Sequence, residues 1–156
     1  MMESGNRKTA GKIEDLIKDL AHRKIPVINE DADIDEIIQA FARSTHSRLI
    51  YVVDPKGRLK GFLSLGNLVR HVFFHFHELR IDTRSFTHMA VSEKAGHFMQ
   101  RTPHFAVASD DMEAVLQRMI KDNIKEIPIV DEEKKVVADL TIVDFLNHYR
   151  KTDSEL

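Results

Sequence analysis

Apolar residues follow two patterns along the chain, and the second half repeats both patterns from the first half. Between residues 34 and 42, and again between 112 and 120, they recur at i, i+3, i+4, i+7 and i+8, which places them on one face of a helix. Each predicted helix is followed by two apolar runs with a polar turn between them, at 49–53 and 59–63 and then at 127–130 and 136–140. Each half is therefore predicted to hold a helix and a β-hairpin, and a second apolar helix closes it.

The two halves also keep a constant offset. Three pairs of polar residues lie 77 positions apart (for example 141 − 64): Asp54 and Asp131, Ser64 and Thr141, and Asn67 and Asp144. A leading strand is expected before each first helix, close to Pro26 and Pro103, which share the offset. We predict a mixed α/β fold of two repeats, each roughly β-α-β-β-α, which pack through their sheets about an approximate two-fold axis.

The repeat sets the expected organisation of the chain. In order, the segments are a flexible N-terminus at 1–11, a first repeat at 12–74, a connecting segment at 75–93, a second repeat at 94–150 and a C-terminal tail at 151–156. Short helices at 13–17 and 95–99 are expected to lead into the repeats. The connecting segment is either a surface connection or a lid or dimer element, and both readings stay open.

Composition narrows the class of protein. The 156 residues are 42% hydrophobic, enough for an ordinary core, and the formal net charge of −2 argues against binding nucleic acid or an anionic membrane through bulk charge. There is no cysteine, which excludes disulfides, thiolate metal sites and cysteine catalysis. Since no signal core is present and no apolar run approaches the ~20 residues of a membrane span, we expect a soluble, cytoplasmic protein.

The end of each hairpin carries the candidate chemistry. Ser64 and Thr141 each stand where a strand meets a helix, and Asn67 and Asp144 follow three positions later. A hydroxyl at a helix N-terminus lies beside free backbone N–H groups that favour a phosphate, and the Asp144 carboxylate one turn on can accept the hydroxyls of a ribose. The same residues also cap a helix when nothing is bound, so a purely structural role is the alternative.

These features resemble the cystathionine-β-synthase (CBS) domain, arranged in tandem as a Bateman module. The strongest marks are the segments 127–131 and 141–146 of the second repeat, and the first repeat keeps weaker ones at 48–54 and 64–69. The resemblance implies a stand-alone regulatory module with no catalytic residue or catalytic cofactor. Such a module binds an adenosine-containing ligand (AMP, ADP, ATP or S-adenosylmethionine) between the repeats, forms a homodimer and signals to a partner protein.

The resemblance also implies further ligand-binding residues. Ile127 and Pro128 lie at family positions that cover an adenine, and Lys125 lies where the family often has a basic residue near phosphate. In the first repeat, Arg48 offers a planar fork that binds oxyanions bidentately, and Tyr51 replaces the usual proline, so that it either stacks on a base or blocks the cleft. The full set of candidate ligand-binding residues is Arg48, Tyr51, Ser64, Asn67, Lys125, Ile127, Pro128, Thr141 and Asp144.

We predict no metal site, and the nearest approach to one is the cluster of His71, His75 and His77. His71 and His75 share a helix face at a spacing that suits a transition metal, but the glutamate of a metalloprotease helix is missing between them. Two alternatives to a nucleotide sensor therefore remain. One is an interaction or dimerisation scaffold with empty clefts, and the other is a metal-responsive binder.

Overall fold

A computed structural model describes the chain at residues 11–44, 47–74, 93–101 and 104–154. The first half contains α1 (Ile13–Ile17), the short 3₁₀ helix η1 (Lys18–Leu20), β1 (Val27–Asn29), α2 (Ile34–Arg43), β2 (Leu49–Val53), β3 (Leu59–Ser64) and α3 (Leu65–Phe74). The second half contains α5 (Ala95–Phe98), α6 (Met112–Lys121), β4 (Glu126–Val130), β5 (Val136–Thr141) and α7 (Ile142–Ser154). None of the helices in the described ranges has the length and apolar character of a membrane span. Residues 1–10 and 75–92, which include His75 and His77, lie outside these ranges.

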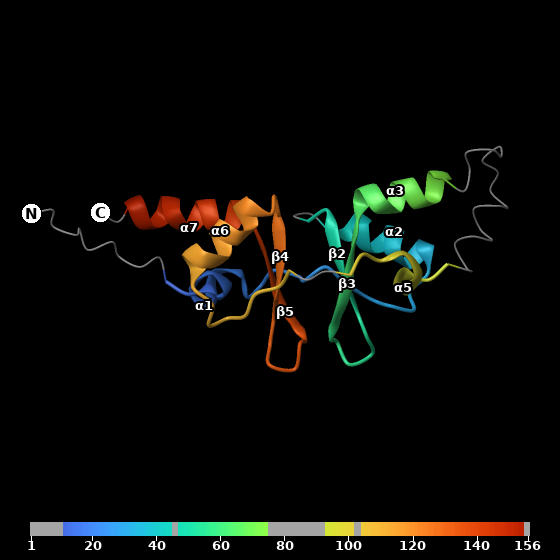
Figure 1. Cartoon of the computed structure of the whole chain (residues 1–156), viewed down its shortest axis with the longest axis horizontal. Coiled ribbons are helices and arrows are strands. Elements are labelled where there is room, and N and C mark those ends of the chain that lie inside the picture. Colours follow the sequence, from blue (N-terminus) through green and yellow to red (C-terminus); the bar gives the residue numbers. More distant parts are fainter. Residues whose placement is uncertain (1–10, 45–46, 75–92, 102–103, 155–156) are drawn as a thin grey trace, which may run out of the picture.

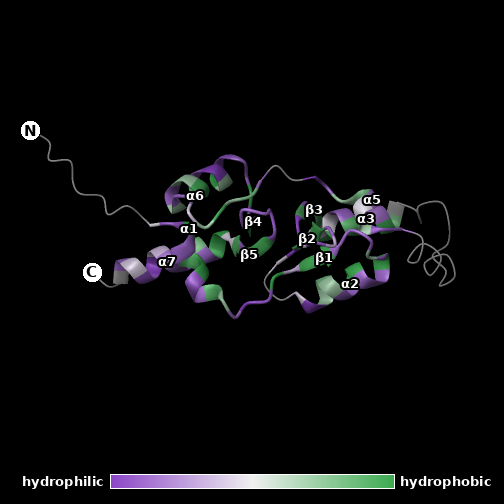
Figure 2. Ribbon diagram, turned by 90° about the horizontal axis from the view of Figure 1, so that it is seen from below, coloured by the Kyte–Doolittle hydropathy of each residue, from purple (hydrophilic) through white to green (hydrophobic). Residues whose placement is uncertain are grey.

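The strands form two small sheets that lie next to each other. One sheet has the order β1-β2-β3, with β1 parallel and β3 antiparallel to β2, and the other is the antiparallel pair β4-β5. Figure 1 shows the two hairpins side by side in the middle of the molecule, with α2, α3 and α5 beyond one sheet and α1, α6 and α7 beyond the other. Figure 2 gives the same order in a view at right angles. The predicted fold of two α/β repeats packed through their sheets is therefore confirmed.

The leading strand of the second repeat is shorter than expected. Within the described residues it is a single parallel bridge between Ala106 and Ile129, so the part of the second sheet that the structure describes has two strands rather than three. The cause is Pro128, which has no N–H to donate to a neighbouring strand. At the equivalent position of the first repeat, the amide of Tyr51 donates to the carbonyl of Pro26 at 2.8 Å and holds β1 in place.

Alternation along each strand divides its side chains between a helix-covered core and the space between the sheets. Val52 and Leu63 join the core of the first repeat, whereas Tyr51 and Phe62 line the space between the repeats. In β4, Ile127 and its neighbour two places on join the core of the second repeat, and Pro128 lies on the opposite face. Each repeat thus has its own apolar core on the outer side of its sheet.

Each short leading helix completes the core of the other repeat. Ile13 and Leu16 of α1 are buried among residues of α6, β4, β5 and α7, and Ala95 of α5 is buried among residues of α2, β2 and β3. Backbone hydrogen bonds hold both helices in these positions. The amide of Met112 donates to the carbonyl of Gly11, and the amide of Ala95 donates to the carbonyl of Ala32, each at 2.9 Å. Neither repeat can therefore form its full core without the other.

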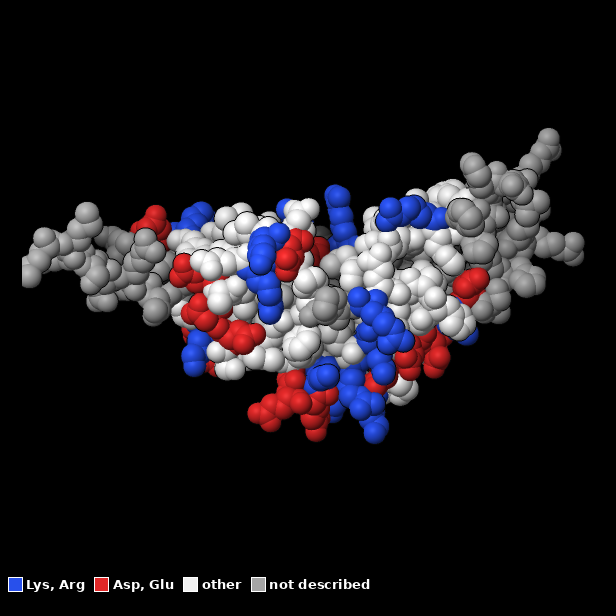
Figure 3. All heavy atoms as spheres, viewed as in Figure 1, with Lys and Arg blue, Asp and Glu red and all other residues white. Residues whose placement is uncertain are grey.

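The two repeats are also joined along their strands. The amide of Leu59 donates to the carbonyl of Lys134 at 2.9 Å, and the amide of Phe62 donates to the carbonyl of Gln100 at 2.8 Å. The second contact requires Gly61, because a Cβ at this position would collide with the Gln100 carbonyl oxygen. Figure 3 shows acidic and basic side chains next to one another at the lower edge of the molecule, where the two hairpin turns meet. These contacts fix how the sheets face each other, and so they shape the space between the repeats.

Candidate functional site

A cavity of about 680 Å³ lies between the two repeats. Its wall comes from β2, β3 and the start of α3 in the first repeat and from residues 104, 123–126 and 128 in the second. Five of the nine candidate ligand-binding residues line it: Arg48, Tyr51, Ser64, Lys125 and Pro128. Although the first and last of them lie 80 positions apart in the sequence (128 − 48), the fold brings them to one site.

The cavity straddles the approximate two-fold axis. Three pairs of its lining residues are related by the repeat offset: Arg48 with Lys125, Leu49 with Glu126, and Tyr51 with Pro128. The backbone follows the same symmetry, because the amide of Leu65 donates to the carbonyl of Arg48 at 3.0 Å and the amide of Ile142 donates to the carbonyl of Lys125 at 2.9 Å. The rest of the wall is asymmetric, since α3 contributes to it and α7 does not.

Polarity changes from the inside of the cavity to its mouth. Tyr51 and Pro128 are buried, Phe62 and Ile124 are half-buried, and together they give the inner wall an apolar character. The basic residues Arg48 and Lys125 are exposed and stand at the entrance. This arrangement suits a ligand with a flat apolar part and an anionic end.

The N-terminus of α3 contributes the polar part of the wall. The amide of Asn67 donates to the Ser64 hydroxyl oxygen at 3.0 Å, so Ser64 caps the helix. Ser64, Leu65 and the neighbouring Gly66 all line the cavity, which places the positive end of a ten-residue helix at its edge. A phosphate at this edge would meet the helix dipole as well as the Arg48 side chain.

Glu126 connects the two repeats at the entrance. One of its carboxylate oxygens accepts from the Ser47 hydroxyl, and the other accepts from the Arg48 amide at 3.2 Å. Ser47 is buried, so this link is partly shielded from water. Glu126 therefore fixes the backbone that carries Arg48, and it places a negative charge near the two basic residues.

The side chain of Tyr51 is buried between the repeats. The residue is 1% exposed, and its hydroxyl oxygen has no hydrogen bond to any group in the part of the chain that the structure describes. Burial raises the pKa of Tyr51 well above its usual value of 10.0, and the nearby carboxylates of Asp139 and Glu126 raise it further. The hydroxyl is thus neutral, and its oxygen has almost no accessible surface, although other atoms of Tyr51 line the cavity.

The second candidate pair, Thr141 and Asp144, lies apart from the large cavity. The amide of Thr141 donates to the Asp144 carboxylate at 2.7 Å, and the amide of Asp144 donates to the Thr141 hydroxyl at 3.3 Å, so the two residues form a cap for α7. Both oxygens of Asp144 also accept from the guanidinium of Arg23, at 2.9 and 2.8 Å. The carboxylate expected to hold a ribose is therefore already paired within the protein.

The charge on Asp144 follows from these contacts. Burial by itself would raise the pKa of Asp144, but the hydrogen bonds from Arg23 and from the Thr141 amide outweigh it and hold the pKa below its ordinary value of 3.8. Arg23 also donates to the carbonyl of Asp139 at 2.7 Å. Asp144 is consequently ionised over the whole physiological range.

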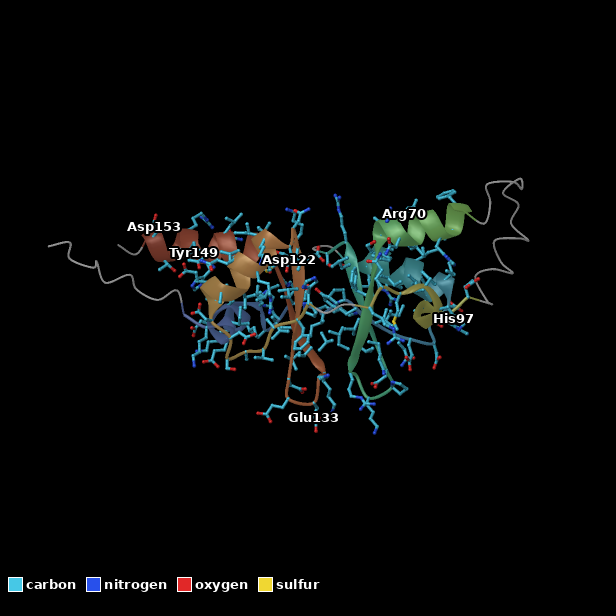
Figure 4. All side chains as sticks on the ribbon, in the orientation of Figure 1. Arg70, His97, Asp122, Glu133, Tyr149 and Asp153 are labelled. Atoms are coloured by element: carbon cyan, nitrogen blue, oxygen red, sulfur yellow. The ribbon has the colours of Figure 1, made fainter. Side chains whose placement is uncertain are left out.

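Two further candidates take other positions. Ile127 is fully buried in the core of the second repeat and lies off the wall of the large cavity, because neighbouring residues of a strand point to opposite faces. The amide oxygen of Asn67 accepts from the Arg70 guanidinium at 2.7 Å on the exposed side of α3. Arg70 is labelled in Figure 4, which shows it on α3.

Sequence reasoning missed three residues that shape the site. Phe62 pairs with Tyr51 across the β2–β3 hairpin, and the hairpin alternation could have placed it on the same wall. Glu126 directly follows Lys125, but its link to Ser47 joins segments 79 positions apart. Arg23 lies in the short stretch between η1 and β1, and nothing in the local sequence indicates its long-range pairing with Asp144.

His71, the described member of the histidine cluster, has its own neighbours. Its ring stacks on Phe98 with centroids 4.3 Å apart, and its Nε2 atom lies 3.8 Å from a carboxylate oxygen of Glu93. Among the described residues, no three histidine or acidic side chains gather closely enough to hold a metal ion.

Comparison with known proteins identifies a family for the chain. The CBS domain family model matches residues 17–73 and 95–151. The uncharacterized protein MJ1426 of Methanocaldococcus jannaschii is 26% identical over 151 residues, which cover 84% of this chain and 89% of that protein. The magnesium transporter MgtE of Thermus thermophilus is 27% identical over 124 residues, which cover 77% of this chain but only 24% of the transporter.

Two solved structures agree with the fold. A CBS domain-containing protein from Thermotoga maritima superposes with a TM-score of 0.68 at 27% identity and covers 91% of this chain and 96% of its own. The cytosolic domain of the Mg²⁺ channel MgtE, solved in complex with ATP, superposes with a TM-score of 0.61 at 26% identity and covers 79% of this chain and 44% of that one.

Proposed function

Because the chain belongs to the CBS domain family and forms a tandem CBS pair, we propose that it is a regulatory module that binds an adenosine-containing ligand between its two repeats. The ligand class comprises AMP, ADP, ATP and S-adenosylmethionine. Binding would join the repeats and shift the population between two packings of the sheets. A partner protein would receive that signal.

The observation that carries this proposal is the cavity on the two-fold axis, with an apolar interior and two cations at its mouth. Its volume of about 680 Å³ lies within the range of about 300–1,000 Å³ that is usual for small-molecule sites. An adenine would lie against Phe62, Pro128 and Tyr51, where burial of its rings is favourable. A phosphate would lie near Arg48, Lys125 and the start of α3, where charge-assisted hydrogen bonds are available.

Related structures with bound ligands support an adenosine-containing ligand as the ligand class. One structural relative holds ATP, and CBS pairs of the same fold have been solved with AMP and with 5′-methylthioadenosine and S-adenosyl-L-methionine. The last two are 14% and 16% identical, so they establish the fold alone and guide the choice of ligands for a test. Since the chain spans about a quarter of the MgtE transporter, we carry over no transport role.

We propose Thr141 and Asp144 as a second and weaker position. A ribose at Asp144 would have to share the carboxylate with Arg23 or displace it. Occupation of this position would therefore need more ligand than the large cavity, and it would disturb the link between Arg23 and α7.

The proposed role is binding without catalysis. Ser64 serves as a helix cap, Glu126 is engaged by Ser47 and Arg48, and the two basic residues at the mouth suit an anion. No step of bond making is needed to explain this arrangement.

We further propose that a second copy of the chain covers the apolar faces of α3 and α7. Large apolar side chains are exposed at equivalent places on the two helices, where Val69 is 44% exposed and Leu146, at the repeat offset of 77, is 62% exposed. Phe73 and Val143 extend these faces, at 54% and 61% exposure. Because the two faces are related by the internal two-fold, the same surface on another molecule is complementary to both.

Thermal unfolding with added ligand tests the proposed function. A ligand that binds only the folded chain increases its free energy of unfolding, by about 2.7 kcal/mol at a ligand concentration of a hundred times Kd, and so raises its unfolding midpoint. We expect such a rise with at least one of the four adenosine ligands and none with uridine monophosphate, which lacks a purine. A midpoint that none of the four ligands moves would favour the scaffold with empty clefts, and a rise with zinc or nickel alone would favour the metal-responsive binder.

A further inference from the structure

Glu126 brings a negative charge to a cavity mouth that is otherwise basic. Among the described residues that line the large cavity it is the only acidic one, beside the basic Arg48 and Lys125. The pKa of Tyr51, on the same wall, is raised by burial and then by the carboxylates of Asp139 and Glu126. The charge of Glu126 therefore acts at the cavity wall, and a ligand there would bind in the field of two positive side chains and one negative one.

The fold does not require a charge at this place. The residue related to Glu126 by the repeat offset of 77 is Leu49, and the residue related to its partner Ser47 is Ile124. Leu49 and Ile124 are apolar, and both line the same cavity. The first repeat thus has a leucine at the position where the second repeat has a carboxylate.

A neutral amide could also make both links of Glu126. One carboxylate oxygen accepts from the Ser47 hydroxyl, and the other accepts from the Arg48 amide. The Ser47 hydroxyl also lies 2.8 Å from the carbonyl oxygen of Leu49, so its proton has another acceptor. A glutamine could therefore donate to the Ser47 oxygen and accept from the Arg48 amide. The link between the repeats needs two polar atoms at this position, and it does not need their negative charge.

We propose that the Glu126 carboxylate makes the cavity selective for an adenosine ligand with a single phosphate, by weakening the binding of ligands with more. This inference rests on the proposed function. Arg48 and Lys125 balance the charge of about −1.5 to −2 that one phosphate group carries at neutral pH. Each further phosphate of ADP or ATP adds negative charge that the carboxylate repels, and the described wall has no further lysine or arginine to balance it. Because a charge acts through space, this effect needs no contact between Glu126 and the ligand.

Calorimetric titration of the full chain with AMP and with ATP, at about pH 8 and without magnesium, tests the inference, because both ligands then carry their full charge. We expect the unaltered chain to bind AMP more tightly than ATP. In Glu126→Gln the affinity for ATP should rise about threefold to tenfold relative to the affinity for AMP, because a through-space repulsion is removed. The relative rise should shrink in about 1 M salt, which screens charges beyond about 3 Å.

Two control variants separate the charge of Glu126 from its structural link. Glu133→Gln removes the same charge from the turn between β4 and β5, which Figure 4 shows at the lower edge of the molecule, and it should leave the ratio of the two affinities unchanged. Ser47→Ala removes one hydrogen-bond partner of Glu126 but keeps its charge, so the affinities for AMP and ATP should change by the same factor. Glu126→Leu copies the residue of the first repeat, and this second neutral variant should raise the relative affinity for ATP as Glu126→Gln does.

The outcomes separate this inference from the proposed function. If the unaltered chain binds AMP, but the ratio of the two affinities is the same in both neutral variants of Glu126, the role of Glu126 is overturned while the adenosine site stands. An equal rise in Glu133→Gln, or an unaltered chain that binds ATP more tightly than AMP, would also overturn it. If neither AMP nor ATP binds, the inference fails, and a titration with S-adenosylmethionine then decides whether the proposed function fails with it.

Discussion

The guanidinium of Arg23 donates to both carboxylate oxygens of Asp144, at 2.9 and 2.8 Å, across 121 positions of the chain. The pair ties the segment before β1 to the first turn of α7, so it links the two repeats away from the large cavity. It also occupies the carboxylate that the sequence suggests for a ribose. The same contact therefore bears on both stability and binding.

Breaking this pair should destabilise the protein. The side chains of Arg23 and Asp144 are 18% and 10% exposed, so Asp144→Asn leaves a largely buried guanidinium with only the Asp139 carboxylate, 3.8 Å away, as its counter-charge, at a cost of about 3 kcal/mol. Urea unfolding measures this loss. The single variant Arg23→Met and the double variant Arg23→Met and Asp144→Asn complete a double-mutant cycle, and we expect the double variant to lose less stability than the two single variants lose together. A loss in the double variant that equals the sum of the two single losses would mean that the pair contributes no net coupling.

The same pair predicts a dependence on acid pH. The pKa of Asp144 is lower in the folded chain than its ordinary value of 3.8, so the contribution of Asp144 to stability is complete above pH 3.8 and is lost as the pH falls toward the folded-state pKa. The difference in unfolding free energy between the unaltered chain and Asp144→Asn should therefore shrink below about pH 3.8. If this difference in unfolding free energy stayed constant as the pH was lowered to about 2, the result would contradict the lowered pKa of Asp144.

Because α1 packs in the core of the second repeat, a mutation in α1 should destabilise the second repeat. Leu16 of α1 is 3% exposed and packs in the core of the second repeat, so Leu16→Ala should cost about 2–5 kcal/mol. Hydrogen exchange should quicken first in α6 and α7, and not in α2, although α2 is much nearer in sequence. Leu65→Ala is the matched control, because Leu65 is 41% exposed and its loss should be small. Faster hydrogen exchange confined to α2 would contradict the packing of α1 in the core of the second repeat.

The proposed dimer depends on the exposed apolar residues of α3 and α7, of which Val69 also lines the cavity. Leu146→Glu places a charge on the exposed face of α7, and we expect sedimentation velocity to report a monomer where the unaltered chain sediments as a dimer. Leu146→Met keeps the face apolar and should keep the dimer. An unaltered chain that sediments as a monomer at every concentration would rule out the proposed surface.

Much of the fold follows from the sequence because its signals are local. The apolar stripes of α2 and α6 and the hairpin turns each lie within about ten residues, and the offset of 77 joins them into two repeats. The exchange of α1 and α5 could not be predicted, because the apolar pattern of a short helix does not specify which core it joins. The single bridge at Ala106 is explained by the absent N–H of Pro128, which the sequence shows directly.

The site was predictable in part for the same reason. Arg48, Tyr51, Ser64, Lys125 and Pro128 stand at the ends or alternate positions of strands, and repeat symmetry brings them together. Ile127 and Pro128 are neighbours on one strand, so only one of them can face the cavity. The pairing of Arg23 with Asp144 depends on the tertiary packing of segments far apart in the chain, which no periodicity encodes.

The most direct test of the central claim is a calorimetric titration of AMP into the unaltered chain and into the double variant Arg48→Ala and Lys125→Ala. The two basic residues stand at the mouth of the cavity on opposite repeats and are exposed, so the variant should fold normally. We predict saturable binding by the unaltered chain, and an affinity at least about tenfold lower in the variant, because charge-assisted hydrogen bonds to the phosphate are lost. Absence of binding by the unaltered chain, or equal affinity in both proteins, would contradict the claim that this cavity is an adenosine-ligand site.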